Sequence, residues 1–133
     1  MDRSGKTILV VDDEPDLALA LAEMLEGYGY RVMEAHSAEE AWKRIQVRRP
    51  DLITCDLMMP RRSGIAFYQA LKRDAGCKDV PVIFISAFSQ PRDFSGPAFR
   101  KLVPDASVPE PAGFLEKPVQ VEKLLALIRG AIG

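Results

Sequence analysis

The 133-residue chain has few of the residues from which zinc sites and disulfide networks are built, with two cysteines and one histidine. Two scattered cysteines form neither a metal motif nor a disulfide framework. Basic residues are not in excess, because 18 lysines and arginines stand against 19 aspartates and glutamates, for a net charge of −1. A nucleic-acid surface needs a basic face. We therefore expect no zinc site, no disulfide and no direct nucleic-acid partner.

Long apolar runs are also missing. No stretch approaches the roughly 20 apolar residues that cross a bilayer, and residues 1–6 lack the apolar segment of a signal peptide. We expect no membrane partner and a cytoplasmic location. The remaining composition, 47% hydrophobic and 28% charged, is that of a globular protein. A chain of this length predicts one domain over residues 1–133.

The scarce cysteine and histidine residues have simple interpretations. Cys55 lies in an apolar run and is predicted to be a small buried residue. His36 has no cysteine, serine or acidic partner at catalytic spacing and is predicted to lie in a loop. We assign neither residue a catalytic role.

Strand and helix patterns alternate along the chain, which predicts a parallel sheet with helices on both faces. The expected strands are the runs 7–11, 31–35, 52–55, 82–85 and 114–116. Helices are expected to begin near Pro15, after Ser37, near Gly64 and near Val121. Proline suits a first helical turn, and Ser37 has the capping-box spacing to Glu40. The first helix is expected to bury one face, formed by Leu17, Leu21, Met24, Leu25 and Tyr28.

The stretch 87–113 interrupts this alternation. It contains prolines at positions 91, 97, 104, 109 and 111, and a proline inside a helix costs about 3 kcal/mol or more. At most one short helix is expected there, from Pro97 to Leu102. The expected fold is therefore α/β, with an atypical proline-rich segment in place of a regular fourth helix.

Polar side chains directly follow four of the expected strands: Asp12 with Asp13, Asp56, Ser86 and Lys117. Open α/β sheets bind ligands at the carboxyl ends of their strands. Adjacent carboxylates repel each other, so a site that keeps both ionised usually supplies a cation. Carboxylate oxygens at two strand ends form a plausible Mg²⁺ site.

The same groups suit phosphoryl transfer. An ionised aspartate can attack phosphorus and carry the phosphoryl group as a mixed anhydride. A metal would neutralise its oxygens, while a hydroxyl and an ammonium hold the rest. Taken singly, the acids could be helix caps, Ser86 an ordinary strand-end hydroxyl and Lys117 a surface amine. Their ordered placement after successive strands favours the functional interpretation.

Four motifs carry a resemblance to a known family: Val10-Val11-Asp12-Asp13-Glu14-Pro15, Asp56-Leu57-Met58-Met59-Pro60 with Gly64, Ile85-Ser86-Ala87, and Phe114-Leu115-Glu116-Lys117-Pro118. With these motifs the chain resembles, over essentially its whole length, the receiver domain of two-component response regulators. The resemblance implies a flavodoxin-like, doubly wound, five-stranded parallel sheet of order 2-1-3-4-5.

The resemblance also implies roles for the acids. Asp56 would be the phosphoacceptor. Asp13 and Asp56 would ligate Mg²⁺ with the carbonyl of Met58 as a third protein ligand, and Asp12 would act mostly through a bound water.

Further roles follow from the same resemblance. Ser86 would donate a hydrogen bond to the phosphoryl group, and Lys117 would pair with it. Phe114 stands at the position of the switch aromatic, which rotates inward as the hydroxyl of Ser86 moves. The peptide bond from Lys117 to Pro118 is expected to be cis, an isomer accessible to proline.

Two features depart from the family pattern. The segment 87–113 is longer than usual and lacks the pattern of the fourth helix, which belongs to the usual signalling face. We hypothesise that it serves a distinct downstream partner; a tolerated surface insertion is an equal alternative. The bulky side chains of Met58 and Phe88 are expected to obstruct hydrolytic water and to slow self-dephosphorylation. Packing against the remodelled loop would also explain them.

The expected function is a phosphorylation-dependent switch, supplied by a histidine kinase or phosphotransfer protein. It would not be an enzyme beyond its own phosphorylation and dephosphorylation. One alternative is a pseudo-receiver, an interaction module that signals without phosphorylation. A less favoured one is a Mg²⁺-dependent aspartyl phosphatase, whose second acid lies two residues after its nucleophile, an arrangement that Asp12-Asp13-Glu14 lacks.

Overall fold

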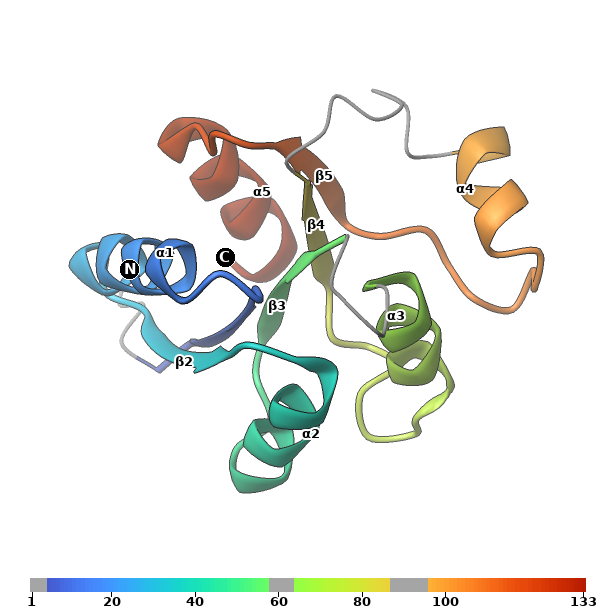
Figure 1. Ribbon diagram of the computed structural model, residues 1–133, viewed down its shortest axis with the longest axis horizontal. Helices are drawn as coiled ribbons and strands as arrows, with labels where there is room; N and C mark the ends of the chain where they lie inside the picture. Colours follow the sequence, from blue (N-terminus) through green and yellow to red (C-terminus); the bar gives the residue numbers. More distant parts are fainter. Residues whose placement is uncertain (1–4, 58–63, 87–95) are drawn as a thin grey trace.

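The computed structural model describes residues 5–57, 64–86 and 96–133, and strands alternate with helices along this part of the chain (Figure 1). The strands are β1 (Thr7–Val11), β2 (Arg31–Ala35), β3 (Leu52–Asp56), β4 (Val82–Ser86) and β5 (Gly113–Glu116). The helices are α1 (Pro15–Gly27), α2 (Ala38–Val47), α3 (Gly64–Arg73), α4 (Gly96–Leu102) and α5 (Val121–Ile132). The strands form one parallel sheet of order β2-β1-β3-β4-β5, which confirms the predicted topology.

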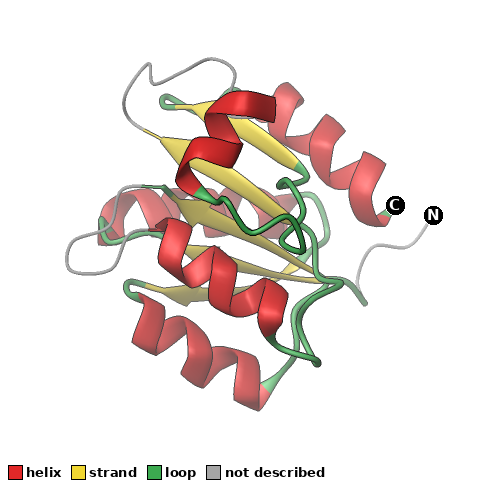
Figure 2. Ribbon diagram, turned by 90° about the vertical axis from the view of Figure 1, so that its right-hand side faces the viewer, coloured by secondary structure: helices red, strands yellow, loops and turns green. Residues whose placement is uncertain are grey.

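Helices cover both faces of the sheet (Figure 2). One face packs against α1 and α5, and the other packs against α2, α3 and α4. In β1, Ile8 and Val10 contribute to the first face and Leu9 and Val11 to the second. Because a strand covered on both faces has no exposed side, β1 is a continuous apolar run and all its residues are buried.

Two helix starts follow local rules. Ser37 is the N-cap of α2, and its hydroxyl accepts a hydrogen bond from the backbone N–H of Glu40 at 3.1 Å. The Glu40 carboxylate accepts from the backbone N–H of His36 at 2.9 Å, so the reciprocal half of the capping box is displaced by one residue. His36 lies in the loop between β2 and α2, as predicted.

The expected buried face of α1 was partly wrong. Leu21 and Leu25 are buried, but Tyr28 is 42% exposed. The reason is that α1 ends at Gly27 and Tyr28 is its C-cap, so the helical period no longer applies to it. The small residues Ala18 and Ala22 are buried instead.

The described part of the proline-rich segment contains the short helix α4 and then a connection to β5. This helix, Gly96–Leu102, lies where a short helix was predicted near Pro97. Phe99, Val103 and Val108 are fully buried in the core on the side of α3, and the rings of Tyr68 and Phe99 meet edge to face at 6.0 Å. These residues are therefore part of the core rather than a surface addition.

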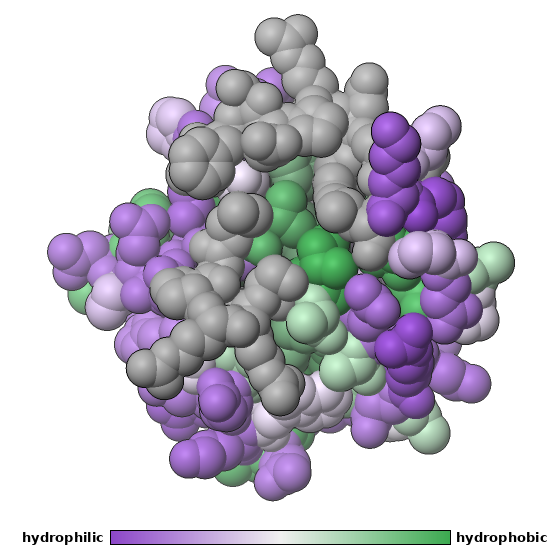
Figure 3. Space-filling view, turned by 45° about the vertical axis from the view of Figure 1, so that its right-hand side comes forward, coloured by the Kyte–Doolittle hydropathy of each residue, from purple (hydrophilic) through white to green (hydrophobic). Residues whose placement is uncertain are grey.

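Arg100 organises the connection after α4. Its guanidinium donates hydrogen bonds to the carbonyls of Val103, Asp105 and Val108 at 3.2, 2.7 and 2.7 Å. The hydroxyl of Tyr68 donates to the carbonyl of Pro109. Figure 3 shows apolar residues near the centre of the face that comes forward, with hydrophilic residues toward its right-hand edge.

Within the described residues, no helix combines the length and the apolar character needed to cross a membrane.

Cys55 is fully buried in β3, as predicted, and burial raises the pKa of its thiol. Its thiol is therefore protonated at neutral pH and is a packing group.

Candidate functional site

The carboxyl edge of the sheet gathers the predicted acids. Asp12 and Asp13 follow β1, and Asp56 ends β3, which pairs with β1 through Val11 and Cys55. Asp12 continues the sheet, because its backbone N–H donates to the carbonyl of Ala35 at 3.0 Å. One carboxylate oxygen from each of the three acids lies within 4.8 Å of the others.

Burial makes this acidic cluster unusual for a protein surface. Asp12 is 2% exposed and Asp56 is 5% exposed, while Asp13 is half-buried. Carboxylates so poorly solvated require compensation by positive charge. Part of it comes from Lys117, which follows β5.

Lys117 reaches across the sheet edge to these acids. Its ammonium nitrogen, Nζ, lies 3.0 Å from Oδ2 of Asp12 and 3.7 Å from Oδ2 of Asp56. Partial burial disfavours the ammonium, but the hydrogen bond to Asp12 and the charges of Asp12 and Asp56 outweigh it and raise the pKa of Lys117. Lys117 is thus a protonated, fixed cation at neutral pH.

The donor set fits a magnesium ion. Mg²⁺ prefers oxygen ligands and few of them from protein, and Asp12, Asp13 and Asp56 offer converging carboxylate oxygens. A single ammonium does not neutralise three carboxylates, so a divalent cation would complete the charge balance. The Met58 carbonyl, the expected third ligand, lies outside the described residues, as does Phe88.

Ser86 lies next to the acids in the sheet. It ends β4 and is fully buried, and the register places it one position beyond Ile85, the partner of Asp56. The backbone N–H of Lys117 donates to the carbonyl of Ser86 at 2.7 Å. The ends of β3, β4 and β5 are thereby held at one edge with their predicted functional residues.

Phe114 lies further back on β5. It is half-buried and packs against the core on the side of α3 and α4.

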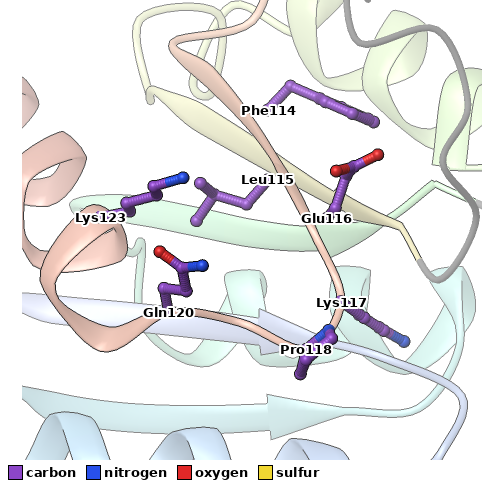
Figure 4. Close-up of a pocket in the computed structure, with 7 residues that line it drawn as sticks. All are labelled: Phe114, Leu115, Glu116, Lys117, Pro118, Gln120 and Lys123. Atoms are coloured by element: carbon purple, nitrogen blue, oxygen red, sulfur yellow. The ribbon is translucent and has the colours of Figure 1, made fainter.

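A hollow of about 360 Å³ runs along β5 and the start of α5. Lys117, Gln120 and Lys123 all line that hollow, and in Figure 4 the side chain of Lys117 extends away from the other two. The peptide bond between Lys117 and Pro118 is cis, as predicted.

Glu14 is a site residue that sequence reasoning missed. Nζ of Lys117 donates to Oε1 of Glu14 at 3.2 Å, and the backbone N–H of Glu14 donates to Oδ1 of Asp12 at 2.9 Å. Its position directly after the aspartate pair was a usable signal, because that residue shares the strand-end loop.

Known proteins similar to this chain support the interpretation drawn from the order of the motifs and from their convergence at one sheet edge. The model for the response regulator receiver domain matches residues 8–129. The chain belongs to this family. Receiver domains act as phosphoacceptor switches rather than as true enzymes, which disfavours the phosphatase alternative.

Curated relatives support the assignment. Protein Rrf1 of Nitratidesulfovibrio vulgaris is 34% identical over 125 residues, covering 94% of this chain and 81% of Rrf1. The phosphate regulon transcriptional regulatory protein PhoB of Pseudomonas aeruginosa is 45% identical over 83 residues, covering 62% of this chain and 36% of PhoB. The transcriptional regulatory protein PdtaR of Mycobacterium tuberculosis is 32% identical over 128 residues, covering 96% of this chain and 57% of PdtaR. This receiver domain thus spans only part of PhoB and PdtaR.

Solved structures show the same architecture. A sensor protein from Polaromonas sp. JS666 superposes with a TM-score of 0.81 at 27% identity, covering 96% of each chain. The chemotaxis protein CheY4 of Vibrio cholerae superposes with a TM-score of 0.79 at 25% identity, covering 95% of this chain and 98% of CheY4. These proteins share the flavodoxin-like arrangement predicted for this receiver domain.

Proposed function

We propose that this receiver domain is a phosphorylation-dependent switch whose phosphoacceptor is Asp56. The observation that carries the proposal is the position of the Asp56 carboxylate. It is buried at the carboxyl edge, within 4.8 Å of two further carboxylates, and its Oδ2 lies 3.7 Å from the ammonium of Lys117. An aspartate in this setting has a cation near its carboxylate that could pair with a transferred phosphoryl group.

In the proposed reaction, a carboxylate oxygen of Asp56 attacks the phosphorus of a phosphohistidine on a histidine kinase or phosphotransfer protein. A new O–P bond forms, and the P–N bond of the donor breaks with its electron pair remaining on the imidazole nitrogen. The product on the receiver is an acyl phosphate. No outside oxidant or reductant takes part.

The residues around Asp56 would stabilise the transferring group. The Lys117 ammonium would pair with one phosphoryl oxygen, and the Ser86 hydroxyl would donate to another. Asp12, Asp13 and Asp56 would hold Mg²⁺, which supplies charge neutralisation of the phosphoryl oxygens. Asp12, 3.0 Å from Nζ, keeps the Lys117 ammonium at this edge of the sheet, within a short distance of Asp56.

The output of the switch would be binding of a downstream protein. Movement of the Ser86 hydroxyl toward the phosphoryl group would draw Phe114 inward along β5. To change the population of conformers decisively, the phosphoryl group must favour one of them by several kcal/mol. A shift from about 1:99 to about 99:1 takes about 5.5 kcal/mol.

The segment 87–113 is the proposed partner surface. Met58 and Phe88 are proposed to slow hydrolysis of the acyl phosphate.

The test is incubation with acetyl phosphate, with and without Mg²⁺, followed by intact-mass measurement. The proposal predicts an adduct of one phosphoryl group that requires Mg²⁺ and is lost in Asp56→Asn. Asp16→Asn, which alters an exposed acid in the first turn of α1, is the matched control and should retain the adduct. Absence of an adduct in the unmodified protein would reject the proposal in favour of a pseudo-receiver.

A further inference from the structure

We propose that Glu14 is a positioning residue that holds the Lys117 ammonium away from Asp56 and thereby slows phosphoryl uptake. The inference rests on the proposed phosphorylation of Asp56 and assigns the control of its rate to a residue outside the predicted site.

The distances around Lys117 carry the inference. Nζ lies 3.0 Å from Asp12 and 3.2 Å from Glu14, both within hydrogen-bonding range, but 3.7 Å from Asp56. The ammonium has three protons to donate, and the two shorter contacts are directed toward the β1 side of the site. Lys117 is therefore held closer to its restraining acids than to the proposed phosphoacceptor.

The side chain of Glu14 does not stabilise the start of α1, although Glu14 is its N-cap residue. A side chain at the N-cap commonly accepts a hydrogen bond from the helix start. Glu14 makes no such side-chain cap bond. Its carboxylate instead reaches Lys117, which lies 103 residues later in the sequence.

The two acids that hold Lys117 differ in how easily they release it. The side chain of Asp12 is 3% exposed, whereas that of Glu14 is 60% exposed. Water competes well for an exposed carboxylate, so its ion pair is weak. The contact of Lys117 with Glu14 is therefore the one that breaks easily, whereas its contact with the buried Asp12 is expected to persist.

Phosphoryl transfer to Asp56 would require the ion pair between Glu14 and Lys117 to lengthen. To pair with a phosphoryl oxygen on Asp56, Nζ has to move toward Asp56 and lengthen its contact with Glu14. Before uptake, the carboxylate of Glu14 contacts the ammonium of Lys117. In the transition state of uptake this contact is weakened. The phosphorylated protein and the transition state of its hydrolysis both have Lys117 on the phosphoryl group. Glu14 therefore slows uptake and leaves the decay rate unchanged.

The experiment compares Glu14→Gln with Asp16→Asn, using acetyl phosphate, fixed Mg²⁺ and constant pH. Both variants remove one negative charge at the start of α1, so Asp16→Asn measures the general effect of charge on an anionic donor. Glu14→Gln is expected to take up phosphoryl roughly two- to fivefold faster than Asp16→Asn, the range spanned by an exposed ion pair. The decay rate of the phosphorylated protein is expected to be equal in the two variants.

A double-mutant cycle shows whether Glu14 acts through Lys117. In a Lys117→Met background, Glu14→Gln is expected to take up phosphoryl no faster than Asp16→Asn in the same background. A second readout is the ¹⁵N NMR signal of the Lys117 ammonium, which should lose protection from solvent exchange in Glu14→Gln and keep it in Asp16→Asn.

Two results would overturn the inference while leaving the proposed function intact. One is equal uptake in Glu14→Gln and Asp16→Asn. The other is an acceleration of Glu14→Gln over Asp16→Asn that is the same with and without Lys117. A protein that takes up no phosphoryl group in any form would overturn both the inference and the proposed function.

Discussion

Gly64 lies directly against the backbone carbonyl of Asp56. The backbone N–H of Gly64 donates to the carbonyl of Leu57 at 2.9 Å, and Gly64 is buried. A β-carbon added at Gly64 would overlap the carbonyl oxygen of Asp56 and come within 3.0 Å of the Leu57 α-carbon. The start of α3 therefore fits against the end of β3 only because residue 64 has no side chain.

Gly64→Ala is predicted to destabilise the fold by about 1–3 kcal/mol, because the backbone on both sides of the contact would have to separate. Denaturant unfolding measures the loss. Gly130→Ala is the control, since a β-carbon there, inside α5, meets nothing within 4 Å. It should stabilise the helix by roughly 0.5–1 kcal/mol. Equal free energies of unfolding for the two variants would contradict the account.

Arg100 is predicted to hold the connection from α4 to β5 in place. Arg100→Ala should lower the free energy of unfolding by about 1.5–3 kcal/mol, the range for hydrogen bonds to a charged group. It should also speed amide exchange at Val103 and Val108, which follow α4. Arg100→Lys should rescue little, because a lysine cannot reproduce the planar fork. Lys101→Ala, at the exposed neighbouring position, should change stability by less than about 0.5 kcal/mol; a similar loss there would reject the role of Arg100.

Asp105 is predicted to link the same connection to acid stability. Hydrogen bonds from the side chain and backbone of Ser107, and then from Arg73, lower the pKa of Asp105 from 3.8 to about 2. Because the folded value lies below the unfolded one, the stabilisation is fully present above about pH 4. It is lost as the pH falls through about 2.

The stability difference between the unmodified protein and Asp105→Ala should therefore be constant at neutral pH and shrink as the pH falls from 4 toward 2. Carboxyl NMR titration would give the pKa of Asp105 directly. Ser107→Ala should move that pKa back toward its ordinary value. An Asp105 pKa that Ser107→Ala leaves unchanged would contradict the assigned cause.

Much of the fold could be predicted because its central strands are buried on both faces. Such strands are continuous apolar runs, and the polar residue that follows each run marks the functional edge. This reasoning located Asp12, Asp56, Ser86 and Lys117, since parallel strands bring their carboxyl ends to one edge. It depends only on local sequence and on the direction of the strands.

The remaining features depend on contacts between distant residues, which a local pattern does not encode. Proline content predicted that 87–113 would contain little helix. It did not predict that Arg100 and Tyr68 would hold the connection between α4 and β5 in place. The contact of Glu14 with Lys117 depends on how two loops meet across the sheet edge. Tyr28 was misplaced because the exact end of α1, rather than the period of its apolar residues, decides its exposure.

The central claim is that Asp56 itself carries the phosphoryl group, and borohydride trapping tests it most directly. Borohydride reduces the acyl phosphate of an aspartate to the alcohol, leaving homoserine at the phosphorylated position, which peptide mass spectrometry can locate. After treatment with acetyl phosphate and Mg²⁺, the account predicts homoserine at position 56 and unmodified aspartate at positions 12 and 13. Homoserine at either of those positions, or at none of the three, would contradict it.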